Sequence, residues 1–108
     1  MLEYYSVVTI PAGARSIRLL ELNASSSYLA IRSVQKKYHL NGRWTIDWPG
    51  RHNIAGTVFD YSRPYNRPES LTASGPTNET LVVEVRTFSS RTTWLELTKC
   101  QLWLDGAG

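Results

Sequence analysis

Four side chains near the middle of the chain could support acid–base or metal chemistry: His39, Asp47, His52 and Asp60. A glycoside hydrolase uses a pair of carboxylates for catalysis, and Asp47 and Asp60 are candidates for such a pair. Asp47, however, directly precedes a Trp-Pro-Gly turn, where aspartate commonly accepts hydrogen bonds from turn amides. Asp60 lies three residues before Arg63, and we expect these two to form a surface ion pair. Because neither histidine has a partner at metal-ligand spacing, we predict no enzyme activity, no metal and no other cofactor.

The basic residues are better candidates for function, because several of them flank the same central segment. The chain carries 12 Lys and Arg against 9 Asp and Glu, a net charge of +3, which suits nucleic acid, sulfated glycans or acidic proteins. Arginine beside tyrosine makes good contact surface, since both bury area at low entropy cost. We predict that a partner or a glycan contacts Arg32, Lys36, Lys37, Arg43, Arg51, Arg63, Tyr65 and Arg67. A charged face that is merely solvated remains the alternative.

Short β-strands must position these residues, because strand signals are strong throughout and helix signals are weak. Alternating or β-branched runs predict strands at 5–10, 16–19, 28–32, 58–61, 71–73 and 80–85. The run 80–85 is continuously apolar, so we expect a central strand that is buried on both faces. Strands that recur every ~8–12 residues with turns between them are typical of an antiparallel sandwich or barrel.

The central segment contains a strong hairpin signal. Asn41-Gly42 is the dipeptide that two-residue hairpin turns prefer, so we predict that 38–40 pairs with a return strand at 44–46. The predicted core consists of Val7, Ile10, Ile17, Leu19, Leu29, Ile31, Trp44, Ile46, Val58, Phe59, Leu81, Val83 and Val85.

Length and cysteine content limit the architecture further. The 108 residues suffice for one domain, and the single cysteine, Cys100, excludes an internal disulfide or a cysteine-rich zinc site. No apolar run reaches the ~18–20 residues that span a bilayer, and Met1 is not followed by a signal peptide. The chain is then either intracellular or an internal piece of a larger protein, and we favour the second.

Sequons at Asn23 and Asn78 fall in predicted turns, so we predict N-glycosylation there and a secreted context.

Several motifs in a fixed order connect the chain with a known family. They are Ile10-Pro11-Ala12-Gly13-Ala14 with Ser16-Ile17-Arg18, then Leu40-Asn41-Gly42, then Asp47-Trp48-Pro49-Gly50, then Gly75-Pro76-Thr77. This pattern resembles the spacer domain of the ADAMTS and ADAMTS-like proteins, from Tyr4 to about Val85. After Val85 the chain departs from it. We therefore divide the chain into a spacer-like β-sandwich at 1–86 and a divergent tail at 87–108, which is either the closing hairpin or a non-family ending.

The resemblance implies a fold and a role. It implies an all-β, jelly-roll-like antiparallel β-sandwich of about ten short strands, placed between a cysteine-rich module and thrombospondin type 1 repeats in a secreted protein of the extracellular matrix. It implies a non-catalytic module that binds matrix proteins or a protein substrate of a parent or associated protease, with heparan sulfate as a further candidate ligand. We expect no nucleic-acid partner and no membrane insertion. A neutral-carbohydrate site built on Trp44 or Trp48, and a purely architectural spacer, remain alternatives.

Overall fold

The computed structural model describes residues 3–21, 28–42, 46–64, 67–87 and 100–105, and for 3–5 and 86–87 it describes the backbone only. These residues form nine strands: β1 (Glu3–Ile10), β2 (Arg15–Glu21), β3 (Tyr28–Ser33), β4 (Tyr38–Leu40), β5 (Gly50–Ile54), β6 (Thr57–Ser62), β7 (Ser70–Ala73), β8 (Leu81–Thr87) and β9 (Cys100–Asp105). Among the described residues no helix is long and apolar enough to cross a membrane.

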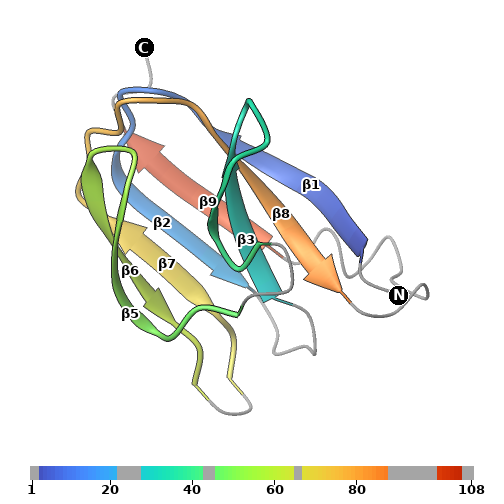
Figure 1. The fold of residues 1–108 in the computed structure, drawn as a ribbon. Helices are drawn as coiled ribbons and strands as arrows, with labels where there is room; N and C mark the ends of the chain where they lie inside the picture. The colour runs from blue at the N-terminus through green and yellow to red at the C-terminus, as the bar shows by residue number, and fades with distance from the viewer. Residues whose placement is uncertain (1–2, 22–27, 43–45, 65–66, 88–99, 106–108) are drawn as a thin grey trace.

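The strands form two antiparallel sheets that pack face to face (Figure 1). One sheet has the order β1-β8-β3-β4, and the other has the order β5-β6-β7-β2-β9. Apolar side chains from both sheets meet in a single core, for example Ile10 and Leu81 from the first with Ile17 and Phe59 from the second. The prediction of an all-β sandwich is confirmed.

Strand β8 is the central strand that its apolar run predicted. It pairs with β1 on one side and with β3 on the other. Leu81, Val83 and Val85 point into the core, whereas Glu84 is buried on the opposite face. The Glu84 carboxylate accepts hydrogen bonds from Arg32 Nε at 2.9 Å and from Tyr38 Oη at 2.6 Å, which satisfies its charge. The second face of β8 is therefore covered by a polar network.

The return strand predicted after Asn41-Gly42 lies mostly outside the described residues, and its last residue, Ile46, lies outside any described strand. Asn41 adopts the positive φ of 54° that a turn residue needs. Its buried side chain donates through Nδ2 to the Leu29 carbonyl and to Tyr61 Oη. The next described strand, β5, belongs to the other sheet.

The predicted core needs one correction. Val58 is 43% exposed, because β6 alternates and places Val58 and Asp60 outward while Phe59 and Tyr61 point into the core. Val7 and Ile46 are half-buried, and Trp44 lies outside the described residues. The core also contains side chains that were not predicted: Ala14, Leu40, Ile54, Ala55, Tyr61, Leu71 and Ala73.

Part of the C-terminal segment joins the sandwich. Strand β9 pairs with β2 through Leu19 opposite Leu102 and Glu21 opposite Cys100, and it lies at the edge of the five-stranded sheet (Figure 1). Leu102 and Leu104 pack against the core. This strand therefore contributes apolar burial that a chain ending before Cys100 would lack.

The alternation of β6 can be tested with two neighbouring substitutions. Phe59→Ala removes a fully buried ring and should lower the free energy of unfolding by about 3–5 kcal/mol. Val58→Ala, one residue away on the solvent side, should lower it by less than about 1 kcal/mol. Urea titrations followed by far-UV circular dichroism measure both. Similar losses for the two variants would contradict the orientation of β6.

Candidate functional site

Two of the predicted contact residues that the structure describes lie against internal partners. Arg32 is half-buried and its guanidinium is held by Glu84, so it serves the fold. Arg63 is also half-buried, with its guanidinium carbon 5.2 Å from the ring centre of Tyr28 and 5.5 Å from that of Tyr61. Two of the predicted binding groups are therefore already occupied by internal partners.

The predicted ion pair between Asp60 and Arg63 is wrong. Asp60 faces solvent and lies 3.5 Å from Arg51 Nε, its neighbour on β5, whereas Arg63 turns to the side of Tyr61. Both Arg51 and Asp60 are largely exposed, and an exposed pair of this kind contributes little stability. Arg67 is exposed in the segment that leads to β7, and Arg43 and Tyr65 lie outside the described residues.

Lys36 and Lys37 are, with Arg67, predicted contact residues that the structure leaves available, and the two lysines lie next to each other in the chain. Both are exposed in the turn between β3 and β4. Among the described residues, neither ammonium group has a carboxylate within ion-pair distance. The turn is fixed by Ser33, whose Oγ accepts hydrogen bonds from the amides of Gln35 at 3.2 Å and Lys37 at 3.1 Å. The backbone that carries the two charges is thus held in one conformation.

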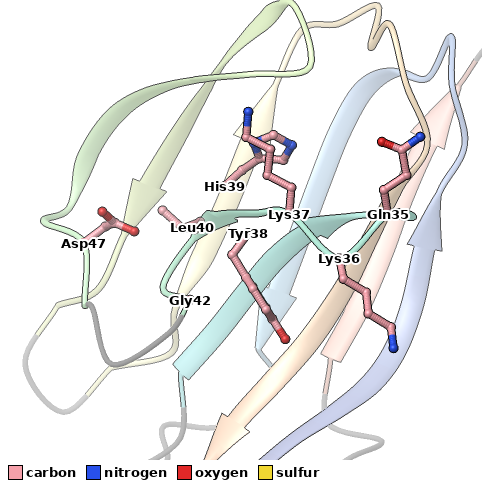
Figure 2. A pocket seen from close by; sticks show the side chains of 8 residues that line it. All are labelled: Gln35, Lys36, Lys37, Tyr38, His39, Leu40, Gly42 and Asp47. Carbon is pink, nitrogen blue, oxygen red and sulfur yellow. The ribbon is translucent and has the colours of Figure 1, made fainter.

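These lysines border an open pocket of 480 Å³ (Figure 2). Figure 2 shows that Lys37 and Lys36 project to opposite sides of the turn. The lining side chains are mostly polar, and all come from the turn, from β4 and from the loop that follows: Gln35, Lys36, Lys37, Tyr38, His39, Leu40, Gly42 and Asp47. Polar groups around a hollow can position a ligand with hydrogen-bonding groups.

The loop on the far wall of this pocket is held by reciprocal hydrogen bonds. The amide of Asn41 donates to Asp47 Oδ2 at 2.6 Å, and the amide of Asp47 donates to Asn41 Oδ1 at 2.7 Å. Asp47 does accept a backbone hydrogen bond, as predicted, but from Asn41 rather than from the Trp-Pro-Gly turn. The carboxylate that was considered for catalysis therefore closes a loop.

Two more side chains hold the same loop from the other sheet. His52 donates through Nε2 to the carbonyl of Trp48 at 2.7 Å, and Arg63 donates through Nη1 to the carbonyl of Asp47 at 3.1 Å. The Trp48 side chain itself is exposed. No local sequence signal predicted this bracing, because the donors come from β5 and from the segment after β6.

The two histidines contact different residues, and the His52 ring also lies edge-on to the Tyr61 ring, with 6.3 Å between the ring centres. His39 Nε2 lies 3.5 Å from Glu79 Oε1, and His52 is bonded to the Trp48 carbonyl. Within the described part of the chain, no group of three His, Cys, Asp or Glu side chains could hold a metal ion.

Carboxylates are also found deep between the sheets. Glu69 is 3% exposed and its Oε2 accepts hydrogen bonds from the amide of Leu29 at 3.2 Å and from Tyr61 Oη. Its own amide donates to Glu21 Oε1 at 3.3 Å. Burial raises the pKa of Glu69 to about 7, and burial followed by the charges of Glu21 and Glu69 raises the pKa of Cys100 to about 12. Since these contacts connect β3 with the five-stranded sheet, the cluster holds the sandwich together and offers no open site.

The sequon at Asn78 lies on the surface, and the one at Asn23 is outside the described residues. The backbone amide of Asn78 donates to the Ala55 carbonyl at 2.8 Å. Its side chain lies so close to Gly56, which has a φ of +77°, that a Cβ there would approach Asn78 Nδ2 to 2.7 Å. The glycan attachment atom therefore sits beside a turn that requires glycine. N-glycosylation itself remains a prediction.

The buried carboxyl group of Glu69 should make stability depend on pH. Its pKa rises from 4.5 in the unfolded chain to about 7 in the folded one, so between these values the folded state holds a proton that the unfolded state releases. The free energy of unfolding should fall as pH rises through this window, by at most about 1.4 kcal/mol per pH unit from this group.

Glu69→Gln should flatten that dependence, because the amide does not titrate. Urea titrations across the window measure it, and Glu79→Gln, which neutralises a more exposed carboxylate, is the matched control. If the Glu69→Gln variant keeps the slope of the parent chain, the assignment of this proton to Glu69 is wrong.

Comparison with known proteins agrees with the motifs and with the fold. The family model of the ADAM-TS Spacer 1 domain matches residues 1–98, further toward the C-terminus than the sequence motifs reach. The chain is 66% identical over 85 residues to "A disintegrin and metalloproteinase with thrombospondin motifs 18" of Mus musculus, and 60% identical over 83 residues to "A disintegrin and metalloproteinase with thrombospondin motifs 16" of Homo sapiens. These alignments cover 79% and 77% of this chain.

A more distant relative has a different name. "Thrombospondin type-1 domain-containing protein 4" of Mus musculus is 45% identical over 86 residues, which cover 76% of this chain. The matched region spans only 7% of the two metalloproteinases and 8% of this third relative, so the similarity concerns one module of much longer proteins. The spacer is a non-catalytic part of the metalloproteinases. The chain belongs to the ADAM-TS spacer family.

Proposed function

We propose that this chain is an extracellular binding module, which contacts protein partners and sulfated glycans on behalf of a longer polypeptide. The observation that carries the proposal is the turn between β3 and β4. It presents Lys36 and Lys37 to solvent beside an open polar pocket, and neither has an acidic partner among the described residues. Charges without internal partners are available to a ligand.

The geometry of the turn favours binding for a second reason. Ser33 accepts hydrogen bonds from two turn amides, and the Ser33 amide donates to the Lys37 carbonyl at 2.8 Å. A ligand that binds here orders two flexible side chains but no backbone, so the entropic cost of association is reduced. Sulfate and carboxylate groups suit these ammonium groups, because each is a compact charge with several hydrogen-bond acceptors.

The partners follow from the chemistry of this surface and from the family. Matrix proteins, or a protein substrate of a parent or associated protease, would supply carboxylates, and heparan sulfate would supply sulfates. The relatives are named as metalloproteinases with thrombospondin motifs, which supports a secreted location at the extracellular matrix as part of a larger chain. A module that only orients its neighbours is the alternative, and it requires no ligand at Lys36 and Lys37.

Salt elution from two resins tests the proposal. The chain should leave heparin resin at clearly higher salt than a sulfonate cation exchanger, because ammonium groups on a fixed backbone can each pair with a sulfate of the glycan, whereas net charge alone favours neither resin. The double variant Lys36→Gln/Lys37→Gln should lose most of this difference.

The matched control is Arg15→Gln/Arg18→Gln, which removes the same charge from exposed positions on β2 in the other sheet. It should shift elution on both resins equally and keep the difference between them. If the parent chain elutes at the same salt from both resins, its basic side chains are merely solvated, and the architectural alternative is favoured.

A further inference from the structure

Asn41-Gly42 is the only Asn-Gly pair in the sequence, and its asparagine side chain is hydrogen-bonded to both sheets. Asparagine followed by glycine is the dipeptide most prone to deamidation. Glycine has no side chain to hinder its backbone nitrogen from attacking the asparagine side chain. The binding function proposed above makes no use of this reactivity, so the pair requires a separate explanation.

The fold requires both residue types at these positions. Asn41 has a φ of 54°, a left-handed conformation that asparagine adopts more readily than most residues. Its Nδ2 donates to the Leu29 carbonyl at 2.8 Å and to Tyr61 Oη at 2.9 Å, and its Oδ1 accepts from the Asp47 amide at 2.7 Å. At position 42 a Cβ would collide with the side chain of Tyr38, so only glycine fits there without a shift. The chain therefore cannot replace this reactive pair without disturbing its own packing.

Deamidation of this pair would proceed through a cyclic imide and consume one water molecule. The Gly42 nitrogen gives its proton to solvent and bonds to Asn41 Cγ, after which the Cγ–Nδ2 bond breaks and Nδ2 takes up a proton and leaves as ammonia. Water then cleaves one of the two carbonyl–nitrogen bonds of the imide. Cleavage at Cγ gives aspartate, and cleavage at the main-chain carbonyl gives isoaspartate, whose main chain contains one additional methylene. No oxidant or reductant takes part.

The folded structure opposes the first step of this reaction. Asn41 Cγ must move onto the Gly42 nitrogen, but hydrogen bonds hold both ends of the Asn41 side-chain amide. Asn41 is also 0% exposed, which keeps water from the amide that has to react. These hydrogen bonds break only when the protein opens locally or globally. Deamidation should therefore proceed through open conformations and not through the folded one.

Both products would fit the folded structure poorly. Aspartate at position 41 has no N–H group for the Leu29 carbonyl or for Tyr61 Oη, and a buried polar group without its partner destabilises the fold. Its charge would also lie near the buried Glu69 carboxylate, which bonds to the same hydroxyl group. Isoaspartate would lengthen the main chain at a point that is fixed on both sides by hydrogen bonds.

We propose that Asn41-Gly42 is a modification site that the fold protects and that unfolding exposes to deamidation. The product accumulates with the time that the chain spends open, and it prevents the return to native packing. Unfolding that is reversible at first thereby becomes irreversible. This inference rests on the fold alone and is independent of the binding function.

The test compares the full chain in native buffer with the same chain in guanidinium chloride above its unfolding midpoint, both at mildly alkaline pH. Trypsin cleaves after Lys37 and Arg43, so the peptide 38–43 reports on Asn41-Gly42, and mass spectrometry detects the exchange of amide for acid. Deamidation of this peptide should be at least about 100-fold slower in native buffer, because its rate follows the population of the open state. Asn53 is the internal control, since it is exposed on β5 but precedes isoleucine, and it should stay intact under both conditions over the same period.

A pair of variants connects the rate with the buried hydrogen bonds. Tyr61→Phe removes the hydroxyl group that accepts from Asn41 Nδ2, and it should accelerate deamidation in native buffer roughly tenfold. Val58→Ala changes an exposed side chain on the same strand and should have a much smaller effect. If Tyr61→Phe does not fold, the comparison of the parent chain in the two buffers still decides the proposal.

Refolding measures the consequence. After increasing times in alkaline guanidinium chloride, the fraction of chain that regains native circular dichroism on dilution should fall in step with the deamidated fraction. Chain kept in the same denaturant at mildly acidic pH, where the imide forms slowly, is the control and should refold fully. Equal deamidation rates in native buffer and in denaturant would overturn the protection, and an intact Asn41 in alkaline denaturant would overturn the site. Full refolding of the deamidated chain would overturn the irreversibility.

Discussion

The rest of the structure depends on the hydroxyl group of Tyr61, buried between the two sheets. It donates to the Glu69 carboxylate and accepts hydrogen bonds from Asn41 Nδ2 at 2.9 Å and from Arg63 Nη1 at 3.1 Å. Asn41 follows the last strand of one sheet, and Tyr61 belongs to the other, so this atom fixes how the sheets face each other. A polar group so deep in a core must keep all its partners, because an unpaired one costs about 1–3 kcal/mol.

The same constraint decides where the exposed groups lie. Asn41 uses its amide side chain for Leu29 and Tyr61 and its backbone for Asp47, so the loop that follows β4 begins from a fixed point. Arg63 contacts Tyr61 and also the carbonyl of Asp47, which ties the other end of the loop to the same hydroxyl group. The position of Trp48 on the surface is thus a consequence of packing in the interior.

Features set by local pattern could be predicted from the sequence, and features set by distant partners could not. Strands β6, β7 and β8 follow from alternation or from an apolar run, which are properties of neighbouring residues. The burial of the Asn41 side chain could not be predicted, because its partners lie on strands β3 and β6 and no local sequence window contains them. The pairing of Asp60 with Arg63 failed because the residue opposite Asp60 in the sheet is Arg51. Of the candidate site, Lys36 and Lys37 were predicted, but the bracing of Trp48 was not.

The chemistry of arginine and lysine explains why charge count was a poor guide to the binding surface. A guanidinium is planar and carries five donors, so it can stack on a ring and bond to carbonyls even when half-buried. Arg63 and Arg18 stack on aromatic rings, and Arg32 is bonded to Glu84. The guanidinium groups of these three residues are therefore in contact with other side chains of the chain itself. An ammonium group is more strongly hydrated and gains less from such contacts, which favours its staying in solvent. The positions that remain open to a ligand in the turn between β3 and β4 are, accordingly, two lysines.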